Sequence, residues 1–358
     1  MKRPSHVPSS PMAFLAALAL LSAGAAADAT EALSLQGKTV TIVVGTTTGG
    51  TTDFSARLMG QYLAKYLPGA PTVIVQNRPG AHALNALSYF AQQAKPDGLT
   101  LAVGSITELD PQNYRVAQSH YDPSTFAMLG GVELGGGILI IRQEARPRLL
   151  DKSAAPVSMG SVSGYPHVTM LMTAWGIDYL GWNARWVQGY PSETASVVLA
   201  LERGEVDMTG FSATGLSDPL LDRSKYAIIY QTGSHAGMVP SPLPAIAATP
   251  LFTAAMRGKI ADPLAQKAFD YWRNTSSVIN WAALPPGTPA DIVDTYRTAF
   301  GKAAPDPGLT VQGKNFSQDF STVSWQNLVA TVRALADTSP EILGFMPEML
   351  RRQGLKVQ

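Results

Sequence analysis

The stretch that decides the fold is TVTIVVGTTTGGTTDFSARLMGQYLAKYL, which runs from Thr39 to Leu67. Its β-branched beginning, Thr39–Val44, predicts a buried strand. Apolar residues recur at helical spacing from Leu58 to Leu67, which predicts an amphipathic helix. A loop of glycine and threonine joins the two elements. The stretch is therefore typical of a βα unit in a mostly parallel sheet.

The loop between this strand and this helix has the composition of an anion site. A strand-to-helix loop exposes the unpaired N–H groups of the helix at the carboxyl edge of the sheet. Glycines let a ligand approach the backbone closely, and threonines add hydroxyl groups. We therefore expect ligand contacts from Thr47, Thr48, Gly49, Gly50, Thr51, Thr52 and Asp53.

Two other interpretations of the loop stay open. The spacing from Gly45 to Gly50 resembles a phosphate-binding loop, but Thr51 stands where such a loop needs lysine, which argues against a nucleotide. The segment can also be an ordinary tight turn in which Thr51 or Thr52 caps the helix. Asp53 can likewise stabilise the helix end instead of contacting a ligand.

Composition and charge narrow the class of protein. The 358 residues are 46% hydrophobic, which is enough for two domains with their own cores. Lys2 and Arg3 precede an apolar run and small residues through Ala27, so residues 1–27 are expected to be a signal peptide and the mature protein periplasmic. The chain has no cysteine, which excludes disulfides and thiolate metal sites.

The charge of the mature chain argues against nucleic acid as a partner. Removing residues 1–27 leaves 25 Lys+Arg (27 − 2) against 26 Asp+Glu, a net charge of −1. The four histidines after the signal peptide do not have metal-ligand spacing, and GSVSG at Gly160–Gly164 has valine where a nucleophile elbow has serine. We expect no metal, no cofactor and no catalysis.

The pattern after Leu67 predicts a second βα series and hence two α/β lobes. Strands are expected at Val73–Gln76 and Thr100–Val103, and Ser105 beyond the latter joins the candidate ligand residues. A strand at Val157–Ser161 opens the second series with another Gly/Ser loop. Candidate ligand residues in the second lobe are Ser161, Ser163, Gly164, Tyr165, Tyr190 and Asp207. For Asp207, at a strand start, anchoring of a turn is the alternative.

The lobes are expected to be joined by two crossings of the chain. These are placed near Ile138–Arg142 and Tyr226–Gln231, the latter being the last expected strand, with only helices after it. The first lobe then comprises residues 28–137 and 232–358, and the second comprises residues 138–231.

Motifs in series along the chain resemble those of one family. They are GGTTD with AR at 49–57, VQNRPGA at 75–81, AKPDGLTL at 94–101, YDP at 121–123, LERGEVD at 201–207 and PPGTPA at 285–290. In this respect the chain resembles the periplasmic receptors of tripartite tricarboxylate transporters, the Bug-type solute-binding proteins. It departs from them at Thr48, where the family has proline, and at His82-Ala83-Leu84, where the family is glycine-rich.

The resemblance implies a two-lobed periplasmic-binding-protein fold of type II, in which the first-lobe loop holds one carboxylate of the ligand and the second-lobe loop holds another group. It implies a monomeric receptor that delivers a small organic carboxylate to the membrane permease subunits of a tripartite tricarboxylate-type transporter. Two alternatives stay open: a periplasmic ligand sensor that docks on a membrane kinase, and a secreted enzyme with the same fold.

Overall fold

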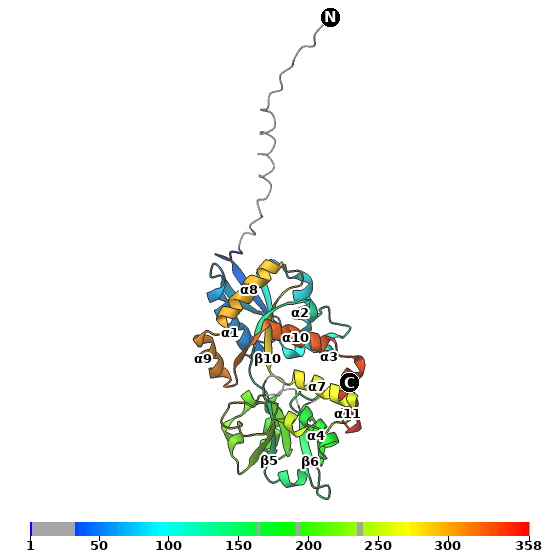
Figure 1. Ribbon diagram of the computed structural model, residues 1–358. Helices are drawn as coiled ribbons and strands as arrows, with labels where there is room; N and C mark the ends of the chain where they lie inside the picture. Colours follow the sequence, from blue (N-terminus) through cyan, green and yellow to red (C-terminus); the bar gives the residue numbers. More distant parts are fainter. Residues whose placement is uncertain (2–32, 163–164, 191–193, 235–238, 358) are drawn as a thin grey trace.

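The computed structural model describes residues 1, 33–162, 165–190, 194–234 and 239–357. Figure 1 shows two lobes, each built around one sheet flanked by helices, with the chain passing between them. Most of the expected signal peptide and the expected ligand residues Ser163 and Gly164 lie outside the described residues. Among the described residues, no helix combines the length and the apolar character needed to cross a bilayer.

The first sheet has six strands with parallel strands at one end and mixed pairing at the other. Their order is β11 (Ser321–Ser324), β4 (Ala127–Glu133), β10 (Ile279–Leu284), β3 (Thr100–Ser105), β1 (Thr39–Val44) and β2 (Thr72–Asn77). Val44 at the end of β1 pairs with Asn77 of β2 and with Val103 of β3. The carboxyl ends of these parallel strands therefore meet at one edge of the sheet.

Helices cover both faces of the first sheet. One face packs against α1 (Thr51–Tyr66) and α8 (Ala290–Ala303), with α9 (Pro307–Phe316) beside α1. The other face packs against α2 (Leu84–Gln93) and α10 (Trp325–Ala336). The short α3 (Pro111–Tyr114) follows β3. Because both faces are covered, the central strands are almost entirely apolar and buried.

The second sheet has five strands. Their order is β7 (Ala184–Tyr190), β6 (Val157–Val162), β8 (Met208–Ser212), β5 (Gly137–Arg142) and β9 (Tyr226–Gln231). The chain enters β5 from the first lobe through Leu134–Gly136 and leaves β9 toward the first lobe. Gly137 pairs with Ser212, and β6 runs parallel to β8. The loops that follow β6 and β8 therefore lie at the end of the sheet that faces the crossing.

The helices of the second sheet come from three parts of the chain. They are α4 (Leu171–Tyr179), α5 (Thr194–Glu202), α6 (Phe252–Ala255), α7 (Pro263–Thr275) and α11 (Pro340–Arg352). Phe252, Trp272 and Met349 share one buried cluster with β5, β6 and α4. The expected lobe boundaries stay a prediction, and this packing favours a second lobe that also includes α6, α7 and α11.

The expectation that only helices follow Gln231 is wrong. The strand β10 lies in the middle of the first sheet between β3 and β4, and β11 extends its edge. The sequence INWAAL at Ile279–Leu284 is short and buried on both faces, so it shows no alternation of polar and apolar residues. The expected helix at Pro263–Val278 consequently ends earlier, at Thr275.

Candidate ligand-binding site

The loop after β1 reaches the N-terminus of a regular helix of 16 residues. The helix begins at Thr51, and Gly50 is the N-cap with extended backbone and no side-chain cap. The threonine capping considered from the sequence is therefore not formed. Thr47, Thr48, Gly49 and Gly50 are exposed, and Thr51 is half-buried. The first N–H groups of α1 thus point toward an exposed loop that has no basic side chain of its own.

The Asp53 side chain is buried and binds the backbone of the loop, so it does not face the solvent. Its carboxylate accepts hydrogen bonds from the Gly49 N–H at 3.0 Å and from the Asn77 amide at 2.9 Å. Arg57 adds two more bonds at 2.9 and 3.0 Å. Burial opposes ionisation, but these bonds outweigh it and hold the pKa of Asp53 below its ordinary value. This geometry supports the alternative in which Asp53 stabilises the helix end.

Asn77 is a residue that the sequence reasoning missed. Its amide nitrogen donates to the Thr46 carbonyl at 3.0 Å, and its amide oxygen accepts from the Thr48 hydroxyl at 3.3 Å. It therefore ties the end of β2 to the loop after β1. The signal was present, because Asn77 belongs to the VQNRPGA motif on which the resemblance rests.

A left-handed turn packs against the same loop. Ala81, His82 and Ala83 have φ values of +47°, +50° and +69°, although none is glycine. A Cβ on Gly45 would lie 2.2 Å from the Ala83 Cβ, so only glycine fits at the end of β1. The turn replaces the glycine-rich stretch of the resembling family and leaves His82 exposed beside the loop.

Ser105 lies at the same edge of the first sheet, where β3 ends. Its hydroxyl donates to the buried Glu108 carboxylate at 2.7 Å and accepts from the Thr107 N–H at 3.3 Å, so the two form a capping box. Burial raises the pKa of Glu108, and the bonds from Ser105 only partly offset this effect. In this structure Ser105 therefore serves the local turn.

Tyr165 brings the second lobe against the first. Burial raises the pKa of its phenol, and the nearby Asp110 charge adds to that effect. A hydrogen bond with Gln112, on α3, acts in the opposite direction. Asp110 in turn accepts a hydrogen bond from the Tyr271 hydroxyl of α7. Asp110, Gln112 and Tyr271 were not expected from the sequence, which gives no sign that α7 meets the region after β3.

The remaining candidates of the second lobe lie in different places. Ser161 is fully buried in β6, near the end that faces the crossing. The Tyr190 hydroxyl donates to Glu205 at 3.4 Å. Asp207 precedes β8 at the opposite end of the sheet, as its neighbour Met208 pairs with Ile141 near the end of β5. The structure therefore brings Thr47–Asp53 and Ser105 to one edge, but it separates Asp207 from Ser161.

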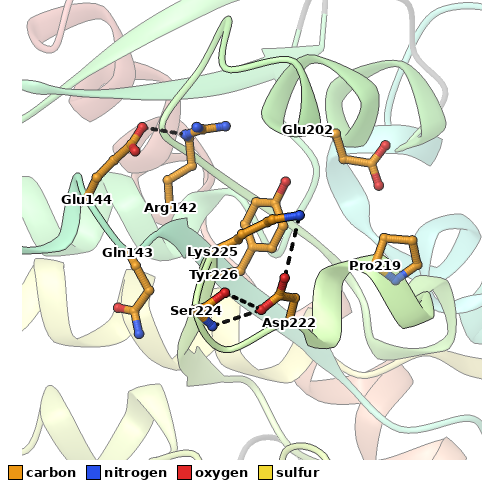
Figure 2. Close-up of a pocket in the computed structure, with 9 residues that line it drawn as sticks. All are labelled: Arg142, Gln143, Glu144, Glu202, Pro219, Asp222, Ser224, Lys225 and Tyr226. Atoms are coloured by element: carbon orange, nitrogen blue, oxygen red, sulfur yellow. Dashed lines mark hydrogen bonds and ion pairs between the residues drawn. The ribbon is translucent and has the colours of Figure 1, made fainter.

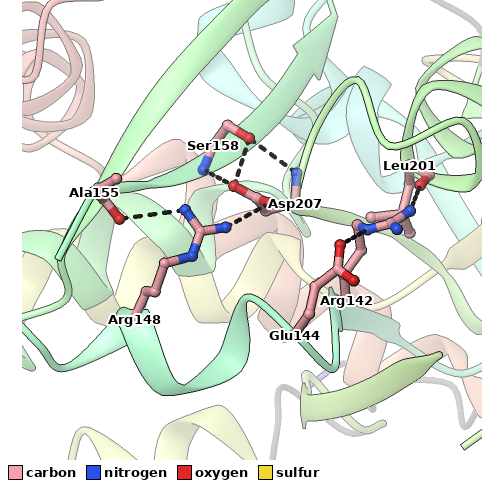
Figure 3. A network of polar contacts seen from close by, with 7 residues as sticks. All are labelled: Arg142, Glu144, Arg148, Ala155, Ser158, Leu201 and Asp207. Atoms are coloured by element: carbon pink, nitrogen blue, oxygen red, sulfur yellow. Dashed lines mark hydrogen bonds and ion pairs between the residues drawn. The ribbon is translucent and has the colours of Figure 1, made fainter. Parts of the chain in front are cut away.

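Figure 3 shows the surroundings of Asp207. Its carboxylate accepts from Arg148 at 2.7 Å and from both the N–H and the hydroxyl of Ser158 at 2.8 Å. The Asp207 N–H donates back to the Ser158 hydroxyl at 2.9 Å. Burial opposes ionisation, yet these bonds hold the pKa of Asp207 below its ordinary value. The arrangement supports the turn-anchoring alternative.

A cavity of about 580 Å³ lies at that same far end of the second sheet (Figure 2). Arg142, the last residue of β5, and Tyr226, the first of β9, line it, so it lies opposite the crossing. Two pairs of its charges form ion pairs, Lys225 with Asp222 at 3.6 Å and Arg142 with Glu144 at 2.9 Å, and Glu202 also lines it. The described residues contain no group of three or more potential metal ligands.

Comparison with solved structures identifies the fold. A TctC solute-binding protein from Polaromonas superposes with a TM-score of 0.62 at 18% identity, covering 88% of this chain and 98% of that one. The chain has the fold of a two-lobed periplasmic binding protein. The same fold is found in MatC from Rhodopseudomonas palustris with bound malate (TM-score 0.53, 20% identity, 88% and 97% covered).

A third structure with this periplasmic-binding-protein fold is an R. palustris protein with adipate. Its TM-score is 0.58 at 21% identity, with 89% of this chain and 98% of that chain covered. No family model and no curated protein matches the chain. At these identities the comparisons describe the fold, and the ligand has to be inferred from the site.

Proposed function

We propose that the protein is a periplasmic solute-binding receptor that captures a small organic carboxylate between its lobes. The observation that carries the proposal is the exposed Gly/Thr loop that ends at Gly50, where α1 begins. Helix N-terminal N–H groups and hydroxyls bind a carboxylate without a basic partner. The motif series and the structures with bound malate and adipate support the same class of ligand.

The proposal includes delivery of the ligand to the permease of a tripartite tricarboxylate-type transporter, with the receptor acting as a monomer and not as an enzyme. The support for this part is the series of family motifs. The support for export is the Lys2-Arg3 start, the apolar run and Ala25-Ala26-Ala27. Intact-mass measurement on periplasmic material should give a mature N-terminus within a few residues of Asp28, and a retained Met1 would contradict export.

A thermal-shift screen of the mature protein against aliphatic and aromatic carboxylates tests the ligand class. A ligand at a hundredfold excess over its dissociation constant should add about 2.7 kcal/mol of apparent stability. Neutral amides of the same acids are the matched control, because they lack the charge that the helix N-terminus favours. Equal shifts with acids and amides would contradict carboxylate capture.

Small-angle scattering tests capture between the lobes. A ligand held by both lobes shifts the equilibrium toward the closed form by its differential affinity for that form. We expect the radius of gyration to fall on ligand addition, and to fall less in Ser163→Ala at equal ligand concentration. An unchanged radius with a ligand of proven affinity would place the site in one lobe.

A further inference from the structure

One buried side chain near the proposed site is left without any polar partner. Asn280, the second residue of β10, is 1% exposed. Neither its amide nitrogen nor its amide oxygen has a hydrogen-bond partner among the described residues. Because burying an unpaired amide costs free energy, each such group in a native protein calls for an explanation.

The position of Asn280 in the sheet places it at the ligand edge. It pairs with Ser105, the last residue of β3, and therefore lies where the parallel strands end. The next residue, Trp281, donates from its indole nitrogen to the Ser105 carbonyl at 2.7 Å, which fixes this register. The loop after β1 leaves the sheet at the same edge, since β1 and β3 are parallel neighbours.

The face on which Asn280 lies is that of α1. Ile279, Trp281 and Ala283 belong to the cluster that α2 and α10 cover. The intervening Ala282 and Leu284 belong to the cluster under α1 and α8. Side chains alternate along a strand, so Asn280 points with Ala282 toward α1. The helix α1 packs across β2, β1, β3 and β10, and it begins at this edge because it follows the loop after β1.

A second unpartnered buried group lies on α1. The Ser55 hydroxyl is fully buried and has no hydrogen-bond partner among the described residues. Two positions before and after it, Asp53 and Arg57 turn toward Asn77 of β2. At 100° per residue Ser55 points away from β2 and shares a face of α1 with Tyr62, whose hydroxyl accepts a hydrogen bond from Gln312 of α9 at 3.0 Å.

From this arrangement we infer that Asn280 forms the inner end of the ligand site and binds a hydroxyl group carried by the carboxylate ligand. The inference rests on the proposed function and narrows its substrate class to hydroxycarboxylates. A hydroxyl group both donates and accepts, so it matches the free amide oxygen and the free amide nitrogen together. A carboxylate oxygen would leave the Asn280 amide oxygen unpaired.

The cost of an unpaired buried polar group should make the site selective for acids that carry the hydroxyl group. A site whose buried polar groups are paired only by the correct ligand discriminates strongly against the analogue that lacks the group. The carboxylate would remain at the exposed N–H groups near Gly50, while the hydroxyl group enters beneath the first turns of α1. Since Asn280 is 1% exposed in this structure, the packing over it must open to admit the hydroxyl group.

Calorimetry with pairs of acids that differ by one hydroxyl group tests the inference. The pairs are malate with succinate, 2-hydroxyglutarate with glutarate, and mandelate with phenylacetate. In at least one pair the wild type should bind the hydroxy acid at least about tenfold more tightly. In Asn280→Leu that preference should fall below about threefold, with little change for the unhydroxylated acid. Asn280→Ala should lose the preference in the same way. Because alanine is smaller than asparagine, this variant excludes poor packing of the introduced leucine as the cause.

Unfolding measurements without ligand distinguish two possible partners of the Asn280 amide, a hydroxyl group of the ligand and a buried water molecule. An amide without a hydrogen-bond partner does not stabilise the folded protein, so its removal in Asn280→Leu should leave the urea midpoint unchanged or raise it. The matched control is Asn183→Leu, because the Asn183 amide donates to the carbonyls of Asp151 and Ala154 at 2.7 and 2.9 Å. That variant should lose stability and keep the hydroxyl preference.

Three results would overturn the inference. The first is binding of both acids of each pair with equal affinity by the wild type, and the second is a hydroxyl preference that persists in both Asn280 variants. The third is a loss of stability in Asn280→Leu as large as in Asn183→Leu, which would assign the amide to a buried water. Binding of none of the six acids by the wild type is a separate result, which contradicts the proposed function and the inference with it.

Discussion

The Ser241 hydroxyl donates to the Asp319 carboxylate at 2.5 Å, joining the chain after β9 to the segment before β11. A Cβ on Gly135, in the first crossing, would lie 2.4 Å from an Asp319 carboxylate oxygen. Asp319 therefore contacts both connections between the lobes. Burial raises the pKa of this carboxyl, and the bond from Ser241 only partly counteracts that effect.

The first prediction concerns Asp319→Asn. A carboxyl whose folded pKa is raised is protonated more readily in the folded than in the unfolded chain, so its stabilisation is lost as pH rises from about 3.8 through the raised value. We expect the variant to be more stable than the wild type at pH 7.5 and to match it near pH 4. Urea midpoints at the two pH values check this, with Ser241→Ala expected to lose stability at pH 7.5. A constant difference between Asp319→Asn and wild type would contradict it.

The second prediction concerns Asp53→Asn, where the sign is opposite. The bonds from Arg57, Gly49 and Asn77 lower the pKa of Asp53, so its stabilisation is present above about pH 3.8 and is lost as pH falls through the lowered value. We expect a loss of about 1–2 kcal/mol in the free energy of unfolding at pH 7, because Arg57 is half exposed. The loss should shrink as pH falls below about 3.8, and a loss that stays constant with falling pH would show that shape rather than charge matters.

The third prediction separates two glycines of the same loop. At Gly45 an added Cβ would lie 2.7 Å from the Ala83 backbone, so Gly45→Ala should cost about 1–3 kcal/mol of stability. At Gly50 the nearest atom is 3.8 Å away and φ is −79°, so Gly50→Val should cost less than about 1 kcal/mol. Gly50→Val should nevertheless weaken carboxylate binding at least about tenfold by calorimetry, because it covers the helix N-terminus. Unchanged affinity in Gly50→Val would remove the loop from the site.

The fourth prediction concerns the left-handed turn. A non-glycine residue in this conformation costs about 1–2 kcal/mol, whereas glycine costs about 0.4–1 kcal/mol in chain entropy. His82 is exposed with φ +50° and ψ +49°, so His82→Gly should raise the stability by up to about 1 kcal/mol. The control is Gln61→Gly on the exposed side of α1, which should lower it by about the same amount. A fall in both variants would show that the turn is unstrained.

Local patterns predicted the first lobe well where one strand is followed by one helix. The strand at Thr39–Val44 has the observed bounds, and the helix after Gly50 ends within one residue of the expected end. The strand at Tyr226–Gln231 also has the expected bounds. In each case the hydrophobic period and the flanking turn residues point the same way, so local chemistry is sufficient.

The features that the sequence did not predict depend mostly on residues that are distant in the chain. Nothing within INWAAL shows that Ile279–Leu284 enters the middle of a sheet begun more than 200 residues earlier. The carboxylate of Asp207 could not be told from a ligand-facing one, because its partners Arg148 and Ser158 are remote in sequence, and Asp53 also has a remote partner, Asn77, besides its neighbours Gly49 and Arg57. The unpartnered state of Asn280 is likewise a property of packing that no motif encodes.

The late position of β10 and α11 has a consequence for biogenesis. The first sheet lacks a central strand until residue 284 has been made, and the buried cluster at the second sheet lacks Met346, Met349 and Leu350 until almost the last residue. Neither core can be completed before its late elements have been made, since long-range pairing must wait for both partners. The order of elements thus postpones completion of both cores to the last part of synthesis, and a chain without completed cores is the form in which a polypeptide can be threaded across a membrane.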